Sequence, residues 1–386
     1  MKNKILGLAD PFSAPNYGTL LQAYALQKAL KDYGVNSEYI NYSSRKFLLY
    51  KKQLSCIKQR IIYLIKGRKR RNIKDIDDLS FFNTRDFKTV NDGFSSFENK
   101  YIISSRRFYN SETIANCKRY AAYMVGSDQS WSKVTIGNCD FFLLKQISSD
   151  YPKYSYAPSI GTTHINEEYL KELTSWLDKF KFLSCREKTN CEVLSRRLNR
   201  NVQYVLDPTL LLTPREWNKI SEPISLPSKE YILCYILGEK DTTAEFAEKL
   251  GAEKKLPVYY ILTRPKYLSK SNVLRPKPGQ FVSLIRDAAC VVTDSFHGSI
   301  FSINFSTQFY SFTKRAVLAD KTNDNDRIME ILNELNLQNR YKEGMPIKFE
   351  DDIDYSKVQV SLNQLRTESQ NYLKTIVDDF DKLGIN

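Results

Sequence analysis

The sequence predicts an α/β protein built from two halves, each with its own parallel β-sheet. The chain of 386 residues is too long for one ordinary hydrophobic core and fits two domains of roughly 150–200 residues. In both halves short apolar segments alternate with helical patterns, which is typical of parallel strands joined by right-handed crossovers. A proline-rich junction at 207–227 separates the halves. Two such halves are expected to enclose a ligand pocket at the carboxyl ends of their strands.

The first half begins with a strand, a loop, a helix and a second strand. The apolar run 4–9 predicts the first strand, and the turn-rich segment 11–18 predicts the loop. Apolar residues recur at helical spacing over 19–33, where Gly34 ends the pattern, and a strand follows at 36–41. Further strands are expected at 120–125, 154–157 and 201–206, with a helix at 167–182. We assign residues 1–207 to an N-terminal domain.

The second half repeats this alternation. Strands are expected at 231–237, 258–262, 290–293 and 308–312, and helices at 242–255, 280–288, 299–305 and 326–335. We assign residues 208–353 to a C-terminal domain. A last helix is expected at 354–383, and residues 354–386 are assigned to it as a separate C-terminal element.

The composition points to a cytoplasmic protein with an anionic partner. Lysine and arginine exceed aspartate and glutamate by 14 charges, and two histidines leave little room for a histidine-rich metal site. The seven cysteines form no CxxC pair, so we expect reduced thiols and neither a disulfide framework nor a zinc site. No apolar run is long enough for a signal peptide or a membrane-spanning helix. No metal and no redox cofactor are expected.

One basic segment suggests a membrane surface as a further partner. Residues 45–74 contain twelve basic residues and no acidic one, and apolar residues recur within it every three or four positions. One interpretation is a helix lying on an anionic membrane at the inner face, or guiding a diphosphate-bearing acceptor. The other, which we favour slightly, is a core-facing helix with a solvated basic side. Nucleic acid is not expected, because no recognisable binding module accompanies the charge.

The strongest candidate site is the segment 290–299, where a buried strand runs into Asp294, Ser295 and His297. Backbone N–H groups at the start of the following helix can face an anion, and Gly298 permits close approach. The imidazole of His297 can give or take a proton near neutral pH. Asp294 could orient this ring or cap the helix. The alternative is that the polar residues are helix caps and His297 is a half-buried structural histidine.

Two further loops follow strands of the first half. In Gly126–Trp131, Asp128 could accept a proton from a sugar hydroxyl and Trp131 could stack on a sugar ring. The alternative is a helix cap with Trp131 in the core. The loop containing Asn16, Tyr17 and Gly18 is a weak phosphate loop, since it lacks GxGxxG and a P-loop lysine.

Cationic candidates are spread over both halves. Arg186 could hold a carboxylate or phosphate in a bidentate fork, although the sequence alone favours a structural pairing with its neighbour Glu187 or a surface charge. Lys314, Arg315 and Arg327 are either pocket cations or surface charge. His164 is a candidate acceptor residue. A nucleophile elbow with a Ser-His-Asp order is absent, so hydrolase chemistry is unsupported.

Taken in order, six segments give the chain a family resemblance. They are Asn16–Leu26, Gly126–Trp131, Tyr156–Gly161, Arg186–Lys188, Val205–Leu212 and Thr293–Gly298. With these segments the chain resembles the polysaccharide pyruvyl transferase family. The resemblance implies two Rossmann-like domains in a GT-B-like arrangement with a cleft between them. It also implies transfer of a pyruvyl group from phosphoenolpyruvate to two hydroxyls of one sugar, as a cyclic ketal. The acceptors are capsule, exopolysaccharide or cell-wall sugars, often linked to undecaprenyl diphosphate.

The resemblance also divides the candidate residues into roles. The N-terminal domain becomes the acceptor side and the C-terminal domain the phosphoenolpyruvate side. Many members carry an arginine two residues before the histidine, where this chain has Ser295, so Arg186, Lys314 or Arg327 would supply the missing charge. A glycosyltransferase using a nucleotide-sugar donor is the alternative function, and a non-catalytic binding protein is a third. The assigned residues are His297 and Asp128 for catalysis; Arg186, Ser295, Gly298, Ser299, Lys314 and Arg327 for phosphoenolpyruvate; and Asn16, Tyr17, Gly18, Gln129, Trp131 and His164 for the acceptor.

Overall fold

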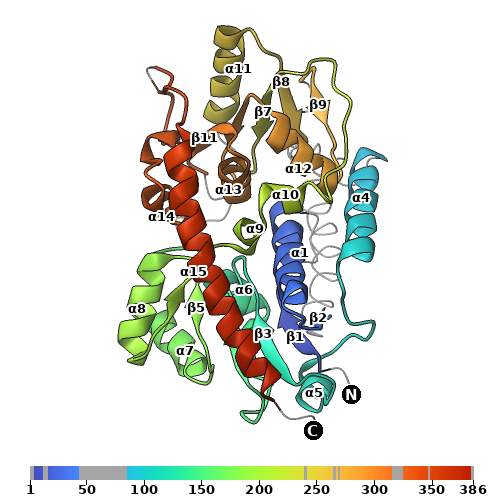
Figure 1. Cartoon of the computed structure of the whole chain (residues 1–386), viewed down its shortest axis with the longest axis vertical. Helices are drawn as coiled ribbons and strands as arrows, with labels where there is room; N and C mark the ends of the chain where they lie inside the picture. The colour runs from blue at the N-terminus through green and yellow to red at the C-terminus, as the bar shows by residue number, and fades with distance from the viewer. Residues whose placement is uncertain are drawn as a thin grey trace, which may run out of the picture.

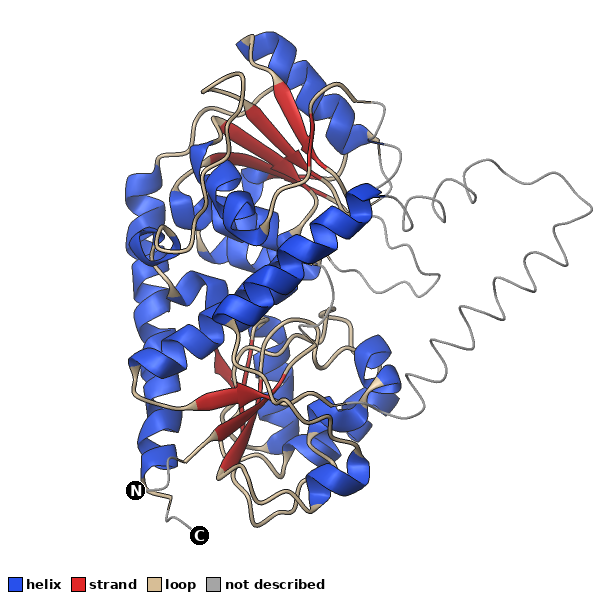
Figure 2. Cartoon of the chain, turned by 90° about the vertical axis from the view of Figure 1, so that its right-hand side faces the viewer, coloured by secondary structure: helices blue, strands red, loops and turns tan. Residues whose placement is uncertain are grey.

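The computed structural model describes residues 4–11, 16–42, 85–238, 241–263, 267, 270–314, 325–346 and 348–383. The predicted basic segment 45–74 and Arg315 lie outside these residues. Two parallel sheets lie at opposite ends of the molecule, with helices packed around and between them (Figure 2). The predicted α/β class with parallel sheets is therefore confirmed.

The sheet of the first half has four parallel strands in the order β2-β1-β3-β4. Its central strand β1 is LGLA, and all four residues are buried. Such a continuous apolar run is typical of parallel strands that are covered on both faces. Leu6 pairs with Ser37 on one side and Ala122 on the other. The strands are β1 (Leu6–Ala9), β2 (Ser37–Tyr39), β3 (Ala122–Val125) and β4 (Lys153–Ser155), and a separate two-stranded sheet joins β5 (Ser184–Cys185) to β6 (Gln203–Tyr204).

The sheet of the second half has six parallel strands in the order β12-β11-β10-β7-β8-β9. Its central strand β10 is CVVT and is buried along its length. The prediction for this strand and for β11 matches the structure residue for residue. The strands are β7 (Ile232–Tyr235), β8 (Val258–Ile261), β9 (Val273–Leu274), β10 (Cys290–Thr293), β11 (Gln308–Phe312) and β12 (Tyr341–Lys342).

The helices cover the sheets and join the halves (Figure 1). Helix α1 of the first half packs on α9, α12 and α13, so it lies against helices of the second half. The helices are α1 (Tyr17–Asp32), α4 (Arg85–Tyr101), α5 (Ser111–Ala115), α6 (Lys133–Asn138), α7 (Glu167–Leu177), α8 (Lys188–Leu198), α9 (Pro208–Leu211), α10 (Pro214–Trp217), α11 (Thr242–Lys254), α12 (Pro278–Asp287), α13 (Phe296–Phe305), α14 (Asp326–Glu334) and α15 (Tyr355–Asp381), with 3₁₀ turns at Asp140–Leu143 and Gln338–Arg340.

The long helix α15 runs along both halves (Figure 1). Near its start, the side-chain amide of Gln359 donates to the carbonyl of Ile303 in α13, at 3.1 Å. Further along, the hydroxyl of Tyr372 donates to the carbonyl of Ser155 in β4, at 2.9 Å. One hydrophobic cluster contains buried residues of β1, β7 and α15 together. The two halves therefore share a continuous core.

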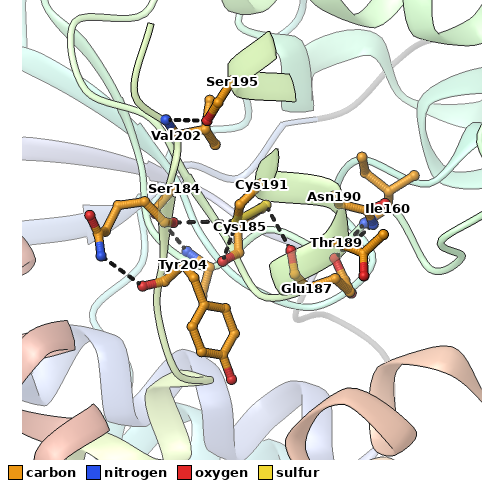
Figure 3. Close-up of a disulfide and its surroundings, with 12 residues drawn as sticks. Ile160, Ser184, Cys185, Glu187, Thr189, Asn190, Cys191, Ser195, Val202 and Tyr204 are labelled. Carbon is orange, nitrogen blue, oxygen red and sulfur yellow. Dashed lines mark hydrogen bonds between the residues drawn. A yellow bond between two sulfur atoms is a disulfide. The ribbon is translucent and has the colours of Figure 1, made fainter. Parts of the chain in front are cut away.

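A disulfide corrects the expectation that all cysteines are thiols. Cys185 at the end of β5 and Cys191 in α8 are bonded, with their Cα atoms 6.0 Å apart (Figure 3). This separation lies within the range of protein disulfides. The tight strand-to-helix connection brings the two residues together across a spacing of six, which no CxxC search detects.

None of the helices in the described part of the chain combines the length and the apolar composition that crossing a bilayer requires.

Candidate functional site

The topology of each sheet creates one crevice at the carboxyl ends of its strands. In the first sheet the chain order reverses between β1 and β3, and in the second between β7 and β10. Such switch points are where open α/β sheets bind ligands, because the loops after the two strands diverge to opposite sides. Asp128 follows β3, whereas Leu237 and Asp294 follow β7 and β10. All three residues line one pocket, so the two crevices meet.

The pocket has a volume of about 100 Å³ and is lined from both halves. Seven of the residues predicted for the site are among its lining residues. They are Asn16, Asp128, Gln129, Ser295, His297, Lys314 and Arg327.

The first half contributes a fixed carboxylate. Asp128 has a positive φ of 60°, a backbone conformation in which aspartate and asparagine are enriched. The hydroxyl of Thr19 donates to its Oδ2 at 2.7 Å. Burial raises the pKa of Asp128, but the interactions with His297, Arg186 and Arg327 outweigh it and hold the pKa below its usual value. Asp128 is therefore held as a carboxylate that can accept a hydrogen bond from a substrate hydroxyl.

The second half contributes the imidazole at the start of a helix. The side chain of Ser295 accepts from the backbone N–H of Gly298 at 3.3 Å, so Ser295 is the N-cap of α13. The cap places His297 in the first turn, two residues before the predicted start of this helix. Asp294 is not the N-cap of this helix. Its carboxylate accepts from the backbone N–H groups of Leu237 and Gly238, at 2.6 and 2.7 Å, and ties β10 to the end of β7.

Positive charge gathers on the side of the second half. Helices α13 and α14 of this half both begin with residues that line the pocket, and helix N-termini favour anions. The N-terminus of α1, from the first half, also reaches the pocket. Lys314 and Arg327 line the same pocket. A guanidinium nitrogen of Arg327 lies 4.0 Å from Oδ1 of Asp128, and Arg327 also lies over the ring of Phe296. This arrangement can hold a small molecule with one or two negative groups.

Arg186 lies behind the pocket and does not line it. It is buried, its Nη1 donates to Oδ2 of Asp207 at 2.5 Å, and its Nη2 lies 3.8 Å from Oδ1 of Asp128. Its guanidinium carbon sits 4.3 Å from the centroid of the Phe296 ring. Burial lowers the pKa of Arg186, but Asp207, Glu187 and Asp128 outweigh this and raise it. The predicted direct contact of Arg186 with phosphoenolpyruvate is replaced by a supporting position between two carboxylates.

Asp207 is the residue that sequence reasoning missed. Its side chain is fully buried, and its Oδ2 lies 3.6 Å from Nε2 of His297. Burial raises the pKa of Asp207, whereas the interactions with His297 and Arg186 lower it, and the net pKa lies far below the usual value. A signal existed, because Asp207 follows strand β6 directly before a helix, as Asp294 follows β10.

Asp10 is a second buried carboxyl near the site. It follows β1 and accepts from the side-chain amide of Gln22 at 2.9 Å. Burial raises its pKa well above the usual value, the bond from Gln22 opposes this, and the charges of Asp128 and Asp207 add to the increase. Asp10 therefore holds its proton more strongly than an exposed aspartate.

Gly18 brings the halves into contact at the imidazole. A Cβ atom at position 18 would lie 2.0 Å from Nδ1 of His297, which is far inside van der Waals contact. Gly18 does not line the pocket. Its lack of a side chain instead lets α1 approach the ring, so its predicted role as an acceptor contact gives way to a packing role.

Two aromatic residues predicted for the acceptor are structural. The indole of Trp131 is fully buried and donates to the carbonyl of Phe142 at 3.2 Å, so it cannot stack on a sugar. Tyr17 is buried between the halves, where its ring stacks on Phe281 and its hydroxyl donates to the carbonyl of Pro276 at 2.6 Å. These rings fill the core next to the polar loops, and neither residue lines the pocket.

Three other predicted residues lie outside the pocket lining. Gly298 packs against the side chain of Thr293, where a Cβ would lie 2.5 Å from the hydroxyl oxygen. The hydroxyl of Ser299 donates to the carbonyl of Ser295 and to Ser311, so it serves the helix and the sheet. The exposed ring of His164 lies 3.7 Å from Asp326 at the start of α14. Direct substrate contacts by Gly298 and Ser299 are not supported by these positions, and the role of His164 stays a prediction.

Among the described residues, no three His, Cys, Asp or Glu side chains are arranged to hold a metal ion.

Comparison with solved structures shows the fold class. The UDP-GlcNAc 2-epimerase from Methanocaldococcus jannaschii is similar over 97% of this chain and 99% of that chain, with 10% identity and a TM-score of 0.51. The glycosyltransferase SnogD from Streptomyces nogalater covers 97% of this chain and 99% of that chain, with 10% identity and a TM-score of 0.40. No curated protein sequence matches the chain. The likeness to the epimerase shows the fold alone, a Rossmann-like, GT-B-like architecture, and the pocket lies where the two halves meet.

The family follows from the sequence pattern. The pattern of the family described as polysaccharide pyruvyl transferase matches residues 16–313, which include every pocket residue of α1 and α13. The chain belongs to this family, and the family places it among the transferases of polysaccharide pyruvylation.

Proposed function

We propose that this protein transfers a pyruvyl group from phosphoenolpyruvate to two hydroxyls of a sugar in a surface polysaccharide precursor, forming a cyclic ketal. The observation that carries the proposal is His297 at the N-terminus of α13, beside Lys314 and Arg327 in a pocket shared with Asp128. Phosphoenolpyruvate carries a carboxylate and a phosphate on three carbons, so it needs cations and N–H donors close together. No cofactor is required, since phosphoenolpyruvate is the co-substrate.

The size of the pocket agrees with a small donor. Pockets that enclose larger organic ligands have volumes of roughly 300–1,000 Å³, whereas this one has about 100 Å³. Lys314 and Arg327 also supply positive charge where Ser295 replaces the arginine that many family members carry. The volume favours phosphoenolpyruvate over a nucleotide-sugar, whereas the charge suits either anionic donor.

In the proposed reaction an acid protonates the methylene carbon of phosphoenolpyruvate, and the neighbouring carbon becomes cation-like. A sugar hydroxyl adds to that carbon and releases its proton to a base. The bond to the phosphate oxygen then breaks, inorganic phosphate leaves, and the second hydroxyl adds with loss of its proton. We assign the acid to His297, the acceptance of a hydroxyl hydrogen bond to Asp128, and the stabilisation of the anionic groups to Lys314 and Arg327.

The acceptor is proposed to be a lipid-linked glycan presented at the inner face of a membrane. The net charge of +14 supports an encounter with a diphosphate-bearing, anionic surface. Asn16 and Gln129 line the pocket on the side of the first half and are proposed to contact this acceptor.

The test incubates the full chain with phosphoenolpyruvate and lipid-linked glycans of defined sequence, and measures product mass and released phosphate. We expect one pyruvyl ketal per phosphate released. In parallel, thermal unfolding is measured with phosphoenolpyruvate, with UDP-sugars and with nothing added, because a bound ligand stabilises the folded state. Stabilisation by UDP-sugars alone would favour a glycosyltransferase. Stabilisation by neither donor, with no product, would favour a binding protein.

A further inference from the structure

The two ring nitrogens of His297 lie in different surroundings. Nε2 faces the carboxylate of Asp207 at 3.6 Å, which is too long for a direct hydrogen bond and short enough for an ion pair. Nδ1 lies against Gly18, where a Cβ atom would come within 2.0 Å of it. Among the described residues, Nε2 has no hydrogen-bond partner at closer range. Asp207 is thus the acceptor best placed to fix the proton on Nε2.

Asp207 is itself held rigidly. Its Oδ1 accepts from the backbone N–H and the hydroxyl of Thr209, at 3.0 and 2.8 Å. Its Oδ2 accepts from Arg186 at 2.5 Å and from the hydroxyl of Ser127 at 3.2 Å. The residue is also the N-cap of α9. A carboxylate with this many donors keeps both its charge and its direction.

Asp128 is the other acidic group that acts on the imidazole, and its position is different. It lines the pocket, its side chain is 17% exposed, and it is bonded to Thr19. Asp207 is absent from the pocket lining and has no exposed side-chain surface. Asp128 can therefore reach a substrate, whereas Asp207 can act only through another side chain.

We propose that Asp207 is a positioning residue that draws the proton of His297 to Nε2 and so fixes the orientation of the ring at the pocket. A carboxylate that faces one ring nitrogen of a histidine favours the proton on that nitrogen. Asp207 belongs to the first half and His297 to the second, so the carboxylate and the imidazole come from different halves. The inference rests on the proposed function for its kinetic consequence, but the placement of the proton is independent of it.

The first experiment needs no variant and no substrate. Histidine is labelled with ¹⁵N, and long-range ¹H–¹⁵N spectra are recorded at neutral pH. The chain has two histidines, so a His164→Gln variant assigns the signals of His297. We expect Nε2 of His297 to give the signal of a protonated nitrogen. An unprotonated Nε2 with a protonated Nδ1 would overturn the proposal.

The second experiment removes the charge. In Asp207→Asn we expect the Nε2 signal to shift toward that of an unprotonated nitrogen and kcat to fall by about 100-fold or more, with KM for phosphoenolpyruvate changed by less than about threefold. Ser127→Ala is the matched control, because it removes a neutral donor to the same oxygen and should leave the Nε2 signal as in the wild type. An unchanged Nε2 signal in a folded Asp207→Asn variant, or a shifted signal with kcat within about threefold, would overturn the proposal.

The outcomes separate this inference from the proposed function. If the wild type transfers no pyruvyl group, the proposed function fails and the ¹⁵N spectra still decide the orientation of the ring. If pyruvyl transfer is observed and Asp207→Asn behaves as the wild type in both measurements, the inference fails and the function stands.

Discussion

The two crevices that meet at the pocket have the same topology and opposite charge. On the side of the first half, carboxyl groups follow strands at Asp10, Asp128 and Asp207. On the side of the second half, two helices begin at the pocket beside Lys314 and Arg327. Arg186 on the first side and Asp294 on the second have the opposite sign, but both are bonded within the protein. Arg186 pairs with Asp207, and Asp294 accepts from the backbone of Leu237 and Gly238.

The difference shows how one architecture can present two kinds of substrate to each other. Carboxylates accept hydrogen bonds from hydroxyls, whereas helix N-termini and cations bind anions. The first half therefore suits a sugar and the second half an anionic donor. His297 belongs to the cationic half and faces Asp207 of the acidic half, so the proposed proton-transfer group lies at the boundary.

The largest expected effect comes from removing that boundary group. His297→Ala should lower pyruvyl transfer by about 1,000-fold or more, because general acid–base groups contribute roughly 10²–10⁴-fold. Turnover is measured by phosphate release with a saturating acceptor. Thermal unfolding of the variant reports whether it folds normally, as we expect. Wild-type turnover in this variant would show that His297 takes no part in the reaction.

A smaller effect is expected from the cationic side alone. Arg327→Ala should raise KM for phosphoenolpyruvate by about 10- to 100-fold, because one charge-assisted contact to an anion is lost. Arg327→Lys keeps the charge and should recover part of this loss. The control is Arg197→Ala, which removes an exposed arginine of α8 that pairs with Glu167. An unchanged KM in Arg327→Ala would place the donor elsewhere.

The smallest expected effect is a pH dependence of folding stability that arises from the carboxyl groups of the first half. The raised pKa of Asp10 means that the folded state binds a proton more tightly than the unfolded state. Its stabilising contribution is complete below the unfolded pKa of about 3.9 and is lost as the pH rises toward the folded value. Asp207 and Asp128 have lowered pKa values, so their contributions are lost in the opposite direction, as the pH falls below this range.

We therefore expect Asp10→Asn to gain stability relative to the wild type as the pH rises from about 4 to 8. Urea unfolding at several pH values measures this difference. The exposed Asp92→Asn variant is the control and should follow the wild type. A constant difference between Asp10→Asn and the wild type over this range would show that Asp10 does not titrate there.

Much of the fold could be predicted from local pattern. Strands β10 and β11 were predicted residue for residue, because each is an apolar run bounded by polar residues or turns. Helices α1 and α13 begin two and three residues earlier than predicted, since Asn16 and Ser295 cap them and the apolar pattern starts later. Helices α4 and α8 were missed. The domain boundaries at 207 and 353 stay a prediction.

The site was predictable where polar residues follow strands and less so elsewhere. This rule found Asp128, Ser295 and His297. The same rule could not show whether the Trp131 ring faces a ligand or the core, because burial depends on packing against elements that are distant in the sequence. The partnership of Asp207 with Arg186 and His297 joins residues far apart in the chain, so no local spacing reveals it.

The helix α15 has a consequence for how substrates enter. With 27 residues it is a rod of about 40 Å, bonded to α13 near one end and to β4 further along. A helix attached to both halves in this way restrains a large rotation of one half relative to the other. Substrate entry and product release would then depend on small relative movements of the halves and on the loops around the pocket.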